Sequence, residues 1–275
     1  SLSVTVTEPG APSNGVAYSY YEGEWDALPD FGTLTPEATG TIGTFVVDPG
    51  QREDYFGLRY VSYVNIPEGE TGTYTFYTQS DDGTRLYVDD ALVVDNDGIH
   101  AVEEESGTTT LTAGWHKITV EYFEAWGGQD LTVLWESDAI AKTEMPAERL
   151  FLSPPQQQLS LRSGWNAISS FVEPDDPALD QVFAETHDLV MVKDGVGNAY
   201  IPSLGVNDIG PWQSDEAYQV FVETEQPLDV TGTLIDSDTP IALEPGWNAV
   251  PFYPRSEMDV VTAFASISDQ LVMVK

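Results

Sequence analysis

Short segments with the composition of β-strands recur through the first half of the chain, which shows almost no helical periodicity. Aromatic and β-branched residues dominate segments such as 55–64, 73–78 and 117–123, and Gly, Pro, Asp or Asn residues separate them. Many short strands with turns at regular spacing are typical of a sandwich or a barrel. The pattern therefore predicts a mainly β fold.

Length and composition predict two folded domains without enzymatic machinery. At 275 residues the chain is expected to form about two domains, and a hydrophobic fraction of 41% is ample for packed β layers. Cysteine is absent, which excludes a disulfide framework, a thiolate metal site and a cysteine nucleophile. No nucleophile elbow, zinc-binding histidine pair or phosphate loop is present, and carboxylates are too abundant for any pair to indicate a glycosidase. The sequence predicts a protein that is not an enzyme.

The charge restricts the possible partners. Asp and Glu number 46 against 10 Lys and Arg, a net charge of −36, which disfavours nucleic acid and anionic membranes as partners. Adaptation to high salt and neutralisation by bound calcium both explain such acidity, and they are compatible. No stretch is long and apolar enough for membrane insertion. No leader-like segment opens the chain, so Ser1 is expected to be a processed start.

Residues 78–88 contain the main metal-site candidate. Asp81 and Asp82 precede Gly83 at the end of one predicted strand, and a second strand follows. Adjacent carboxylates at a strand end suit Ca²⁺, which takes several oxygen ligands and tolerates irregular geometry. Aspartate also favours turns, and on spacing alone an acidic hairpin turn is the stronger interpretation. Asp89-Asp90, residues 95–98 and the acidic loop 103–105 are predicted to be turns or solvated surface.

Several motifs in the first half occur together in one order. They are Tyr20-Tyr21-Glu22-Gly23-Glu24-Trp25 with Leu28-Pro29-Asp30-Phe31, Phe76-Tyr77-Thr78-Gln79-Ser80-Asp81-Asp82-Gly83 with Leu86-Tyr87-Val88-Asp89, Ser106-Gly107 before Leu111-Thr112-Ala113-Gly114-Trp115-His116, and Glu121-Tyr122-Phe123-Glu124 before Gly127-Gly128. On these motifs residues 15–150 resemble the PA14 domain family, which has a β-barrel-like sandwich and is common in adhesins.

The resemblance implies a calcium-dependent lectin site. In calcium-dependent PA14 lectins two consecutive aspartates joined by a cis peptide bind calcium, and vicinal sugar hydroxyls complete the coordination, which assigns Asp81 and Asp82 here. A second calcium loop would lie at residues 125–130. Ala125 stands where asparagine is often found, so Gln129 and Asp130 are expected to replace it as ligands. The predicted ligand-binding residues are Asp81, Asp82, Trp126, Gly127, Gly128 and His100. Trp126 is equally compatible with a core position, and His100 with a structural one.

The second half contains a repeat. Gly164-Trp165-Asn166-Ala167 recurs as Gly246-Trp247-Asn248-Ala249, and residues 189–193 recur as 271–275, in both cases 82 residues later. Short helices are predicted at 176–184 and 257–267. These repeats weakly resemble Gly-Trp-Asn modules of exported bacterial proteins. The expected organisation is a strand and linker at 1–14, the PA14-like domain at 15–150, a Pro/Gln linker at 151–158, repeat 1 at 159–240 and the incomplete start of repeat 2 at 241–275.

Three functions are compatible with these features. The first is a secreted or surface-displayed bacterial adhesin segment that binds glycans through Ca²⁺, with the repeats as a stalk. The second is a structural subunit of an extracellular filament or surface layer, in which residues 2–7 self-associate by strand exchange with a neighbour. The third is a non-catalytic module of a larger glycan-degrading enzyme.

Overall fold

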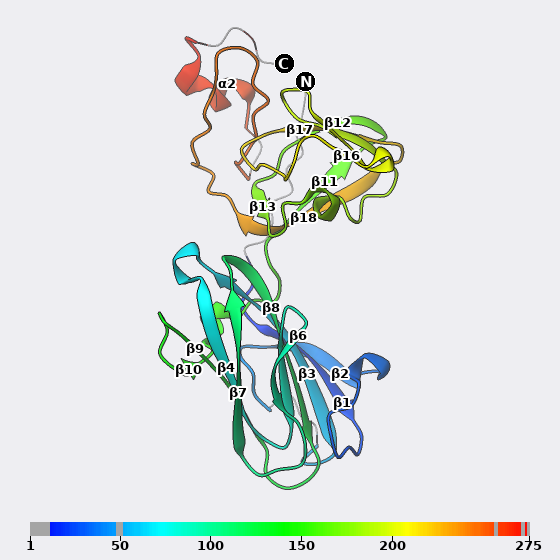
Figure 1. The fold of residues 1–275 in the computed structure, drawn as a ribbon, viewed down its shortest axis with the longest axis vertical. Helices are drawn as coiled ribbons and strands as arrows, with labels where there is room; N and C mark the ends of the chain where they lie inside the picture. The colour runs from blue at the N-terminus through cyan, green and yellow to red at the C-terminus, as the bar shows by residue number, and fades with distance from the viewer. Residues whose placement is uncertain (1–11, 48–51, 256–257, 271–272, 274–275) are drawn as a thin grey trace. The chain divides into compact units, whose positions relative to one another are not determined.

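The computed structural model describes residues 12–47, 52–255, 258–270 and 273, which form two compact units (Figure 1). One unit is Pro12–Pro154, and the other contains the described residues from Pro155 on. Within these ranges no helix is both long enough and apolar enough to span a bilayer. The single strand predicted at residues 2–7 lies outside the described residues, so the strand-exchange hypothesis stays a prediction.

The first unit is a sandwich of two antiparallel sheets. The six-stranded sheet has the order β2-β1-β3-β8-β5-β6, and the four-stranded sheet has the order β10-β9-β4-β7. Their bounds are Val16–Glu22 (β1), Ala38–Ile42 (β2), Phe56–Ile66 (β3), Gly72–Asp81 (β4), Thr84–Val88 (β5), Ala91–Asn96 (β6), Glu103–Leu111 (β7), Gly114–Glu124 (β8), Asp130–Ser137 (β9) and Thr143–Glu144 (β10), with single turns of 3₁₀ helix at Phe31–Thr33, Glu68–Glu70 and Ala147–Arg149. The predicted mainly β, PA14-like sandwich is confirmed.

Alternation along the strands builds the core between the sheets. In β4 every second residue from Tyr74 to Ser80 is buried, and in β3 alternate residues such as Leu58, Tyr60 and Val64 are buried. Aromatic residues of both sheets belong to this core, and within the four-stranded sheet the rings of Tyr74 and Trp135 have centroids 5.7 Å apart. The packed sandwich holds the strand ends, and therefore the loops that join them, in fixed positions.

The β5–β6 hairpin confirms one predicted turn, and β7 corrects another prediction. Asp89 and Asp90 have φ of 49° and 64°, the left-handed values that the tight turn of a hairpin requires. The expected acidic loop at 103–105 is instead the start of β7, because these residues pair with the end of β4, with Glu103 opposite Ser80. Their side chains are exposed, as predicted for solvated surface.

The second unit also has two sheets around its own core. Their orders are β11-β18-β13 and β12-β17-β14-β15-β16. The elements are Gln156–Leu161 (β11), Gly164–Ile168 (β12), Val172–Pro174 (β13), Leu179–Val182 (α1), Leu189–Lys193 (β14), Ala199–Ile201 (β15), Pro202–Leu204 (3₁₀), Val206–Asn207 (β16), Tyr218–Val222 (β17), Gln226–Leu234 (β18), Val260–Ala263 (α2) and Ala265–Ile267 (3₁₀). The helix predicted at 176–184 is thus shortened to α1. The second predicted helix, at 257–267, is divided into α2 and a 3₁₀ turn, and residues 256–257 lie outside the described residues.

The predicted Pro/Gln linker at 151–158 contains ordered structure at both of its ends. Phe151 forms an isolated β-bridge with Tyr63 in the first unit. Gln156 begins β11, and Gln157 is buried because its side-chain carbonyl accepts hydrogen bonds from the Ser170 hydroxyl at 2.9 Å and from the Phe171 N–H at 2.9 Å. The division between the units falls between Pro154 and Pro155. Composition alone suggested a spacer, whereas these tertiary hydrogen bonds make the glutamine part of the core.

The two Gly-Trp-Asn copies share one local structure. The Asn166 side chain accepts from the Arg162 N–H at 2.9 Å and donates to the Arg162 carbonyl at 2.8 Å, and Asn248 makes the same two bonds with Glu244, also at 2.9 and 2.8 Å. Gly164 and Gly246 both have positive φ, at 97° and 116°, which explains glycine at this corner. The side chain of asparagine therefore closes the loop before each motif.

Replacing Asn166 by alanine should lower the free energy of unfolding of the second unit by about 1 to 2 kcal/mol, since two backbone groups lose their partner. Hydrogen exchange would show faster exchange in β12 and unchanged exchange in β3 of the first unit. The matched change Asn248→Ala, in the copy whose motif lies outside any described strand, should leave β12 protected. Equal effects of both variants on β12 would contradict this assignment.

Candidate metal and ligand site

The candidate site is formed where β4 ends and β5 begins. Asp81 is the last residue of β4, and the peptide bond that joins it to Asp82 is cis, as the PA14 resemblance implies. The loop 97–102 after β6 and the loop 125–129 between β8 and β9 meet this turn through hydrogen bonds to Asp82. Three segments that are distant in sequence therefore converge on the aspartate pair.

Asp82 is the buried anchor of the site. Asp82 is 2% exposed. Its two carboxylate oxygens accept hydrogen bonds from the backbone N–H groups of His100 at 3.0 Å and of Ala125 at 2.9 Å. Charge-assisted bonds of this kind fix the orientation of a carboxylate. Ala125, which offers no oxygen on its side chain, is thus fully buried and contributes its N–H to Asp82.

Glu124 completes an acidic cluster with Asp81 and Asp82. One carboxylate oxygen from each of the three residues lies within 4.8 Å of the others. Glu124 is fully buried, and its Oε2 accepts a hydrogen bond from the Tyr122 hydroxyl at 3.0 Å, whereas its Oε1 has no hydrogen-bond partner. A buried carboxylate oxygen without a partner is costly, so this atom needs a donor or a cation.

Asp81 lies against the glycine-rich loop. A Cβ atom added to Gly128 would stand 2.8 Å from Asp81 Oδ2, so a side chain at this position would displace the Asp81 carboxylate. The backbone carbonyl of Asp81 accepts the Tyr122 hydroxyl at 2.6 Å. The same tyrosine therefore holds both Asp81 and Glu124 in place.

Electrostatics in the cluster favour a positive charge. Burial, and then the nearby Asp82, raise the pKa of Asp81. Burial raises the pKa of Glu124 to about 7, and the negative charges of Asp82, Asp81 and Asp54 add to the effect. The pKa of His100 is raised although burial opposes it, because its ring nitrogens contact the carbonyls of Asn96 at 3.1 Å and Ala101 at 3.0 Å. Carbonyls only accept, so these two contacts favour the protonated form of the ring, in which both nitrogens donate.

The other predicted ligands are placed differently. Asp130 is paired opposite Asp81 across β4 and β9, but its Oδ2 accepts from Gln79 at 3.0 Å and it is not a member of the three-carboxylate cluster. The Gln129 amide donates to the Glu53 carbonyl. Gly127 donates its N–H to Asp54 at 3.0 Å. Trp126 is 54% exposed, which removes the alternative of a core position.

Glu124 is a site residue that the sequence patterns did not predict. It lies in the motif Glu121-Tyr122-Phe123-Glu124, one of those that carry the PA14 resemblance. The signal that could have found it is its position directly before the predicted calcium loop at 125–130. The role of Glu124 depends on the pairing of β8 with β5, in which Tyr122 stands opposite Thr84.

The donor set fits a hard divalent cation. Three carboxylates supply oxygen ligands and up to three negative charges, and one of their oxygens is buried without a partner. With no sulfur and no imidazole nitrogen in the cluster, softer transition metals are less well matched. The cluster could therefore hold a metal ion of the Ca²⁺ type.

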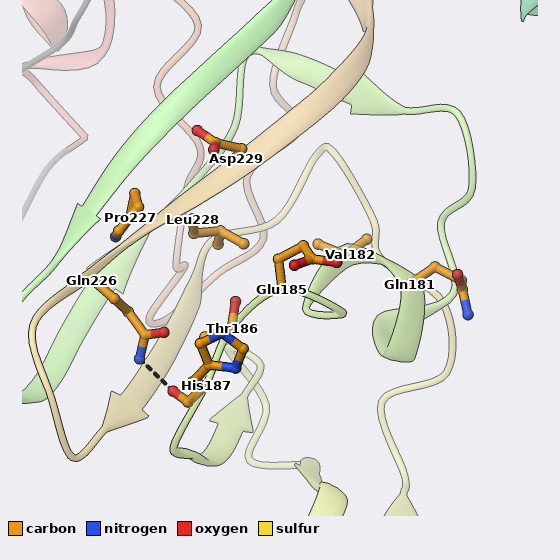
Figure 2. A pocket seen from close by; sticks show the side chains of 9 residues that line it. All are labelled: Gln181, Val182, Glu185, Thr186, His187, Gln226, Pro227, Leu228 and Asp229. Atoms are coloured by element: carbon orange, nitrogen blue, oxygen red, sulfur yellow. Dashed lines mark hydrogen bonds between the residues drawn. The ribbon is translucent and has the colours of Figure 1, made fainter. Parts of the chain in front are cut away.

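A separate cavity of about 310 Å³ lies in the second unit (Figure 2). Its lining comes from the end of α1 with the loop that follows and from the first part of β18. The Gln226 amide donates to the His187 carbonyl at its edge. None of the predicted ligand residues lines this cavity.

Comparison with known proteins identifies the first unit. The PA14 domain family model matches residues 12–149, half of the chain, so this chain belongs to the PA14 domain family. Among curated proteins, the anti-sigma-I factor RsgI3 of Acetivibrio thermocellus is 27% identical over 181 residues, which cover 64% of this chain and 27% of that protein. The chain thus spans about a quarter of that relative's length.

Two solved structures have a similar fold at low identity. The PA14 domain of the MpAFP antifreeze protein is 16% identical, with a TM-score of 0.44, over 54% of this chain and 95% of that domain. The PA14 sugar-binding domain from an RTX adhesin is 16% identical, with a TM-score of 0.41, over 50% of this chain and 98% of that domain.

Proposed function

We propose that the first unit is a calcium-dependent carbohydrate-binding module without catalytic activity. The observation that carries the proposal is the carboxylate cluster of Asp81, Asp82 and Glu124, with a buried and unpartnered Glu124 oxygen. Membership in the PA14 family supports it, because in the calcium-dependent lectins of this family two consecutive aspartates bind the calcium that contacts the sugar.

In this proposal the three carboxylates of the cluster hold the calcium ion. Asp82, fixed by two backbone N–H groups, and Asp81, at the end of β4, would hold Ca²⁺ together with Glu124. Asp130 and Gln129 are retained as further candidate ligands, through Asp130's position opposite Asp81. Bound calcium would supply positive charge and open coordination positions for two vicinal sugar hydroxyls.

The remaining predicted residues would orient the sugar. Trp126 is exposed beside Ala125 and can stack on the apolar face of a pyranose ring. Gly128 leaves the loop without a side chain next to Asp81, and Gly127 has a φ of 112°, which favours glycine. The backbone N–H of His100 orients Asp82, and its ring would add positive charge when protonated.

The glycans of this proposal are extracellular or cell-surface polysaccharides, and the protein would be displayed outside the cell. A single site should bind weakly, near the millimolar range, and display of many copies would raise avidity. The same module would serve attachment to a surface.

A glycan array with calcium, repeated with EDTA, tests the proposal directly. Wild-type protein should bind in calcium and lose the signal in EDTA. Asp81→Asn should lose at least about tenfold in affinity, because one charged ligand is removed. The side chain of Asp81 accepts no hydrogen bond in the described structure, so folding should be unchanged.

The matched control is Asp138→Asn, which removes the same charge at an exposed position outside the cluster. It should bind like wild type. Absence of binding to every glycan in calcium would refute the lectin function, and the structural-subunit hypothesis would then be the stronger one.

A further inference from the structure

The cavity in the second unit has two walls from different parts of the chain (Figure 2). One wall is the end of α1 with residues 185–187 of the loop that follows it, and the other is the first part of β18, residues 226–229. Ligand pockets in proteins have volumes of about 300 to 1,000 Å³. At about 310 Å³ the cavity is large enough for a small organic molecule.

Hydrogen bonds and core packing hold the two walls in place. The Gln226 amide donates to the His187 carbonyl, which joins the strand wall to the loop wall. The next loop residue, Asp188, accepts the Glu223 N–H at 3.1 Å through its carbonyl. Leu228, on the strand wall, is 3% exposed and belongs to the core of this unit. The cavity is therefore formed before a ligand enters, as most ligand pockets are.

The cavity has a carboxylate on each wall. Glu185 lies on the loop wall and Asp229 on the strand wall (Figure 2). The Gln158 amide donates to Asp229 Oδ1 at 3.0 Å and so orients this carboxylate. None of the described lining residues is a lysine or an arginine. Two carboxylates in such a lining attract a cation and repel an anion.

The geometry of the lining does not suit a bare metal ion. A hard metal ion needs several oxygen ligands around one point. Within the described ranges, the group of three metal-ligating side chains that lie close enough together is Asp81, Asp82 and Glu124 of the first unit, and no such group lines this cavity. The cation that fits the cavity is therefore larger than a single ion.

Apolar surface and one hydroxyl complete the lining. Val182, Pro227 and Leu228 can cover a hydrocarbon segment and remove it from water. The Thr186 hydroxyl, next to Glu185, can accept a hydrogen bond from an ammonium group. A molecule that matches this lining has a short hydrocarbon chain with an ammonium group at each end.

We propose that the cavity binds a linear aliphatic diamine, with one ammonium group at Glu185 and the other at Asp229. The hydrocarbon chain between them would lie on Val182 and Leu228. This binding is separate from the carbohydrate binding proposed for the first unit and does not use its carboxylate cluster. Both carboxylates are exposed, and exposed ion pairs are weak, so the affinity should be near the millimolar range.

An NMR titration of the whole chain in calcium tests the proposal with putrescine, butylamine and butanediol. These probes share a four-carbon chain and carry two, one and no ammonium groups. Calcium is included because it competes with amines for the carboxylate cluster of the first unit. Amide shifts at residues 181–187 and 226–229 should saturate with putrescine, require about fivefold more butylamine, and stay unchanged with butanediol. In Glu185→Gln the affinity for putrescine should fall about fivefold, close to the wild-type affinity for butylamine.

The matched control is Glu244→Gln, which removes the same charge at an exposed position of the second unit outside the cavity. It should bind putrescine like wild type. Shifts confined to the first unit, or shifts over the whole acidic surface without saturation, would overturn the inference. So would equal affinities for putrescine and butylamine in wild type, a response to butanediol, or an unchanged putrescine affinity in Glu185→Gln. The glycan array does not depend on this cavity, so the proposed lectin function is tested separately.

Discussion

The Asp82→Ala variant should lose calcium-dependent glycan binding and also about 2 to 3 kcal/mol of the free energy of unfolding in EDTA. The buried carboxylate of Asp82 accepts the N–H groups of His100 and Ala125. Removing it leaves both donors without a partner, and each unsatisfied buried donor costs about 1 to 3 kcal/mol. Relief of repulsion with Asp81 and Glu124 offsets part of this cost, which sets the expected value toward the lower end.

The neighbouring residue provides the contrast. Asp81→Ala should lose glycan binding to the same extent but change the free energy of unfolding little, because the Asp81 side chain accepts no hydrogen bond within the described residues. Urea unfolding in EDTA measures the stabilities, and calorimetry with calcium measures binding. If the two variants were equally stable, the anchoring role assigned to Asp82 would be wrong.

The sequence could predict the strands but not the convergence at the site. The alternation from Thr73 to Thr78 follows from local propensity, and it places the aspartate pair at a strand end. Glu124 reaches the pair only because β8 lies beside β5, a pairing between residues about 40 positions apart. Spacing along the chain carries no information about such pairings, so the third carboxylate could not be derived from it.

The repeat shows the same division between local and long-range effects. Asn166 and Asn248 close their loops with the same hydrogen bonds, which the shared Gly-Trp-Asn motif explains. Residues 164–168 form β12 because β17 pairs along them, whereas 246–250 have the same motif and form no strand in the described structure. Strand formation therefore depends on a partner strand, whereas the loop depends on one side chain.

Glu124→Gln should stabilise the protein in EDTA at pH 8 by about 2 to 3 kcal/mol and weaken calcium binding. The folded chain raises the pKa of Glu124 from 4.5 to about 7, chiefly through burial. Between these values the folded state holds a proton that the unfolded state has released, so the contribution of Glu124 to stability falls as pH rises from about 4.5 to 7. A shift of this size corresponds to about 3 kcal/mol. Glutamine does not titrate and keeps an oxygen for the Tyr122 hydroxyl.

The measurement is the stability difference between the variant and wild type, from urea unfolding at pH 4.5, 6 and 8. In EDTA the difference should rise with pH and level off above about pH 7. With saturating calcium at pH 8 it should shrink or reverse, because the ion stabilises the wild type more strongly than the variant. Glu105→Gln removes the same charge at an exposed position. It therefore separates the general effect of a lower net charge from the specific effect of the buried Glu124. A difference independent of both pH and calcium would show that Glu124 is a neutral structural residue and would remove it from the metal site.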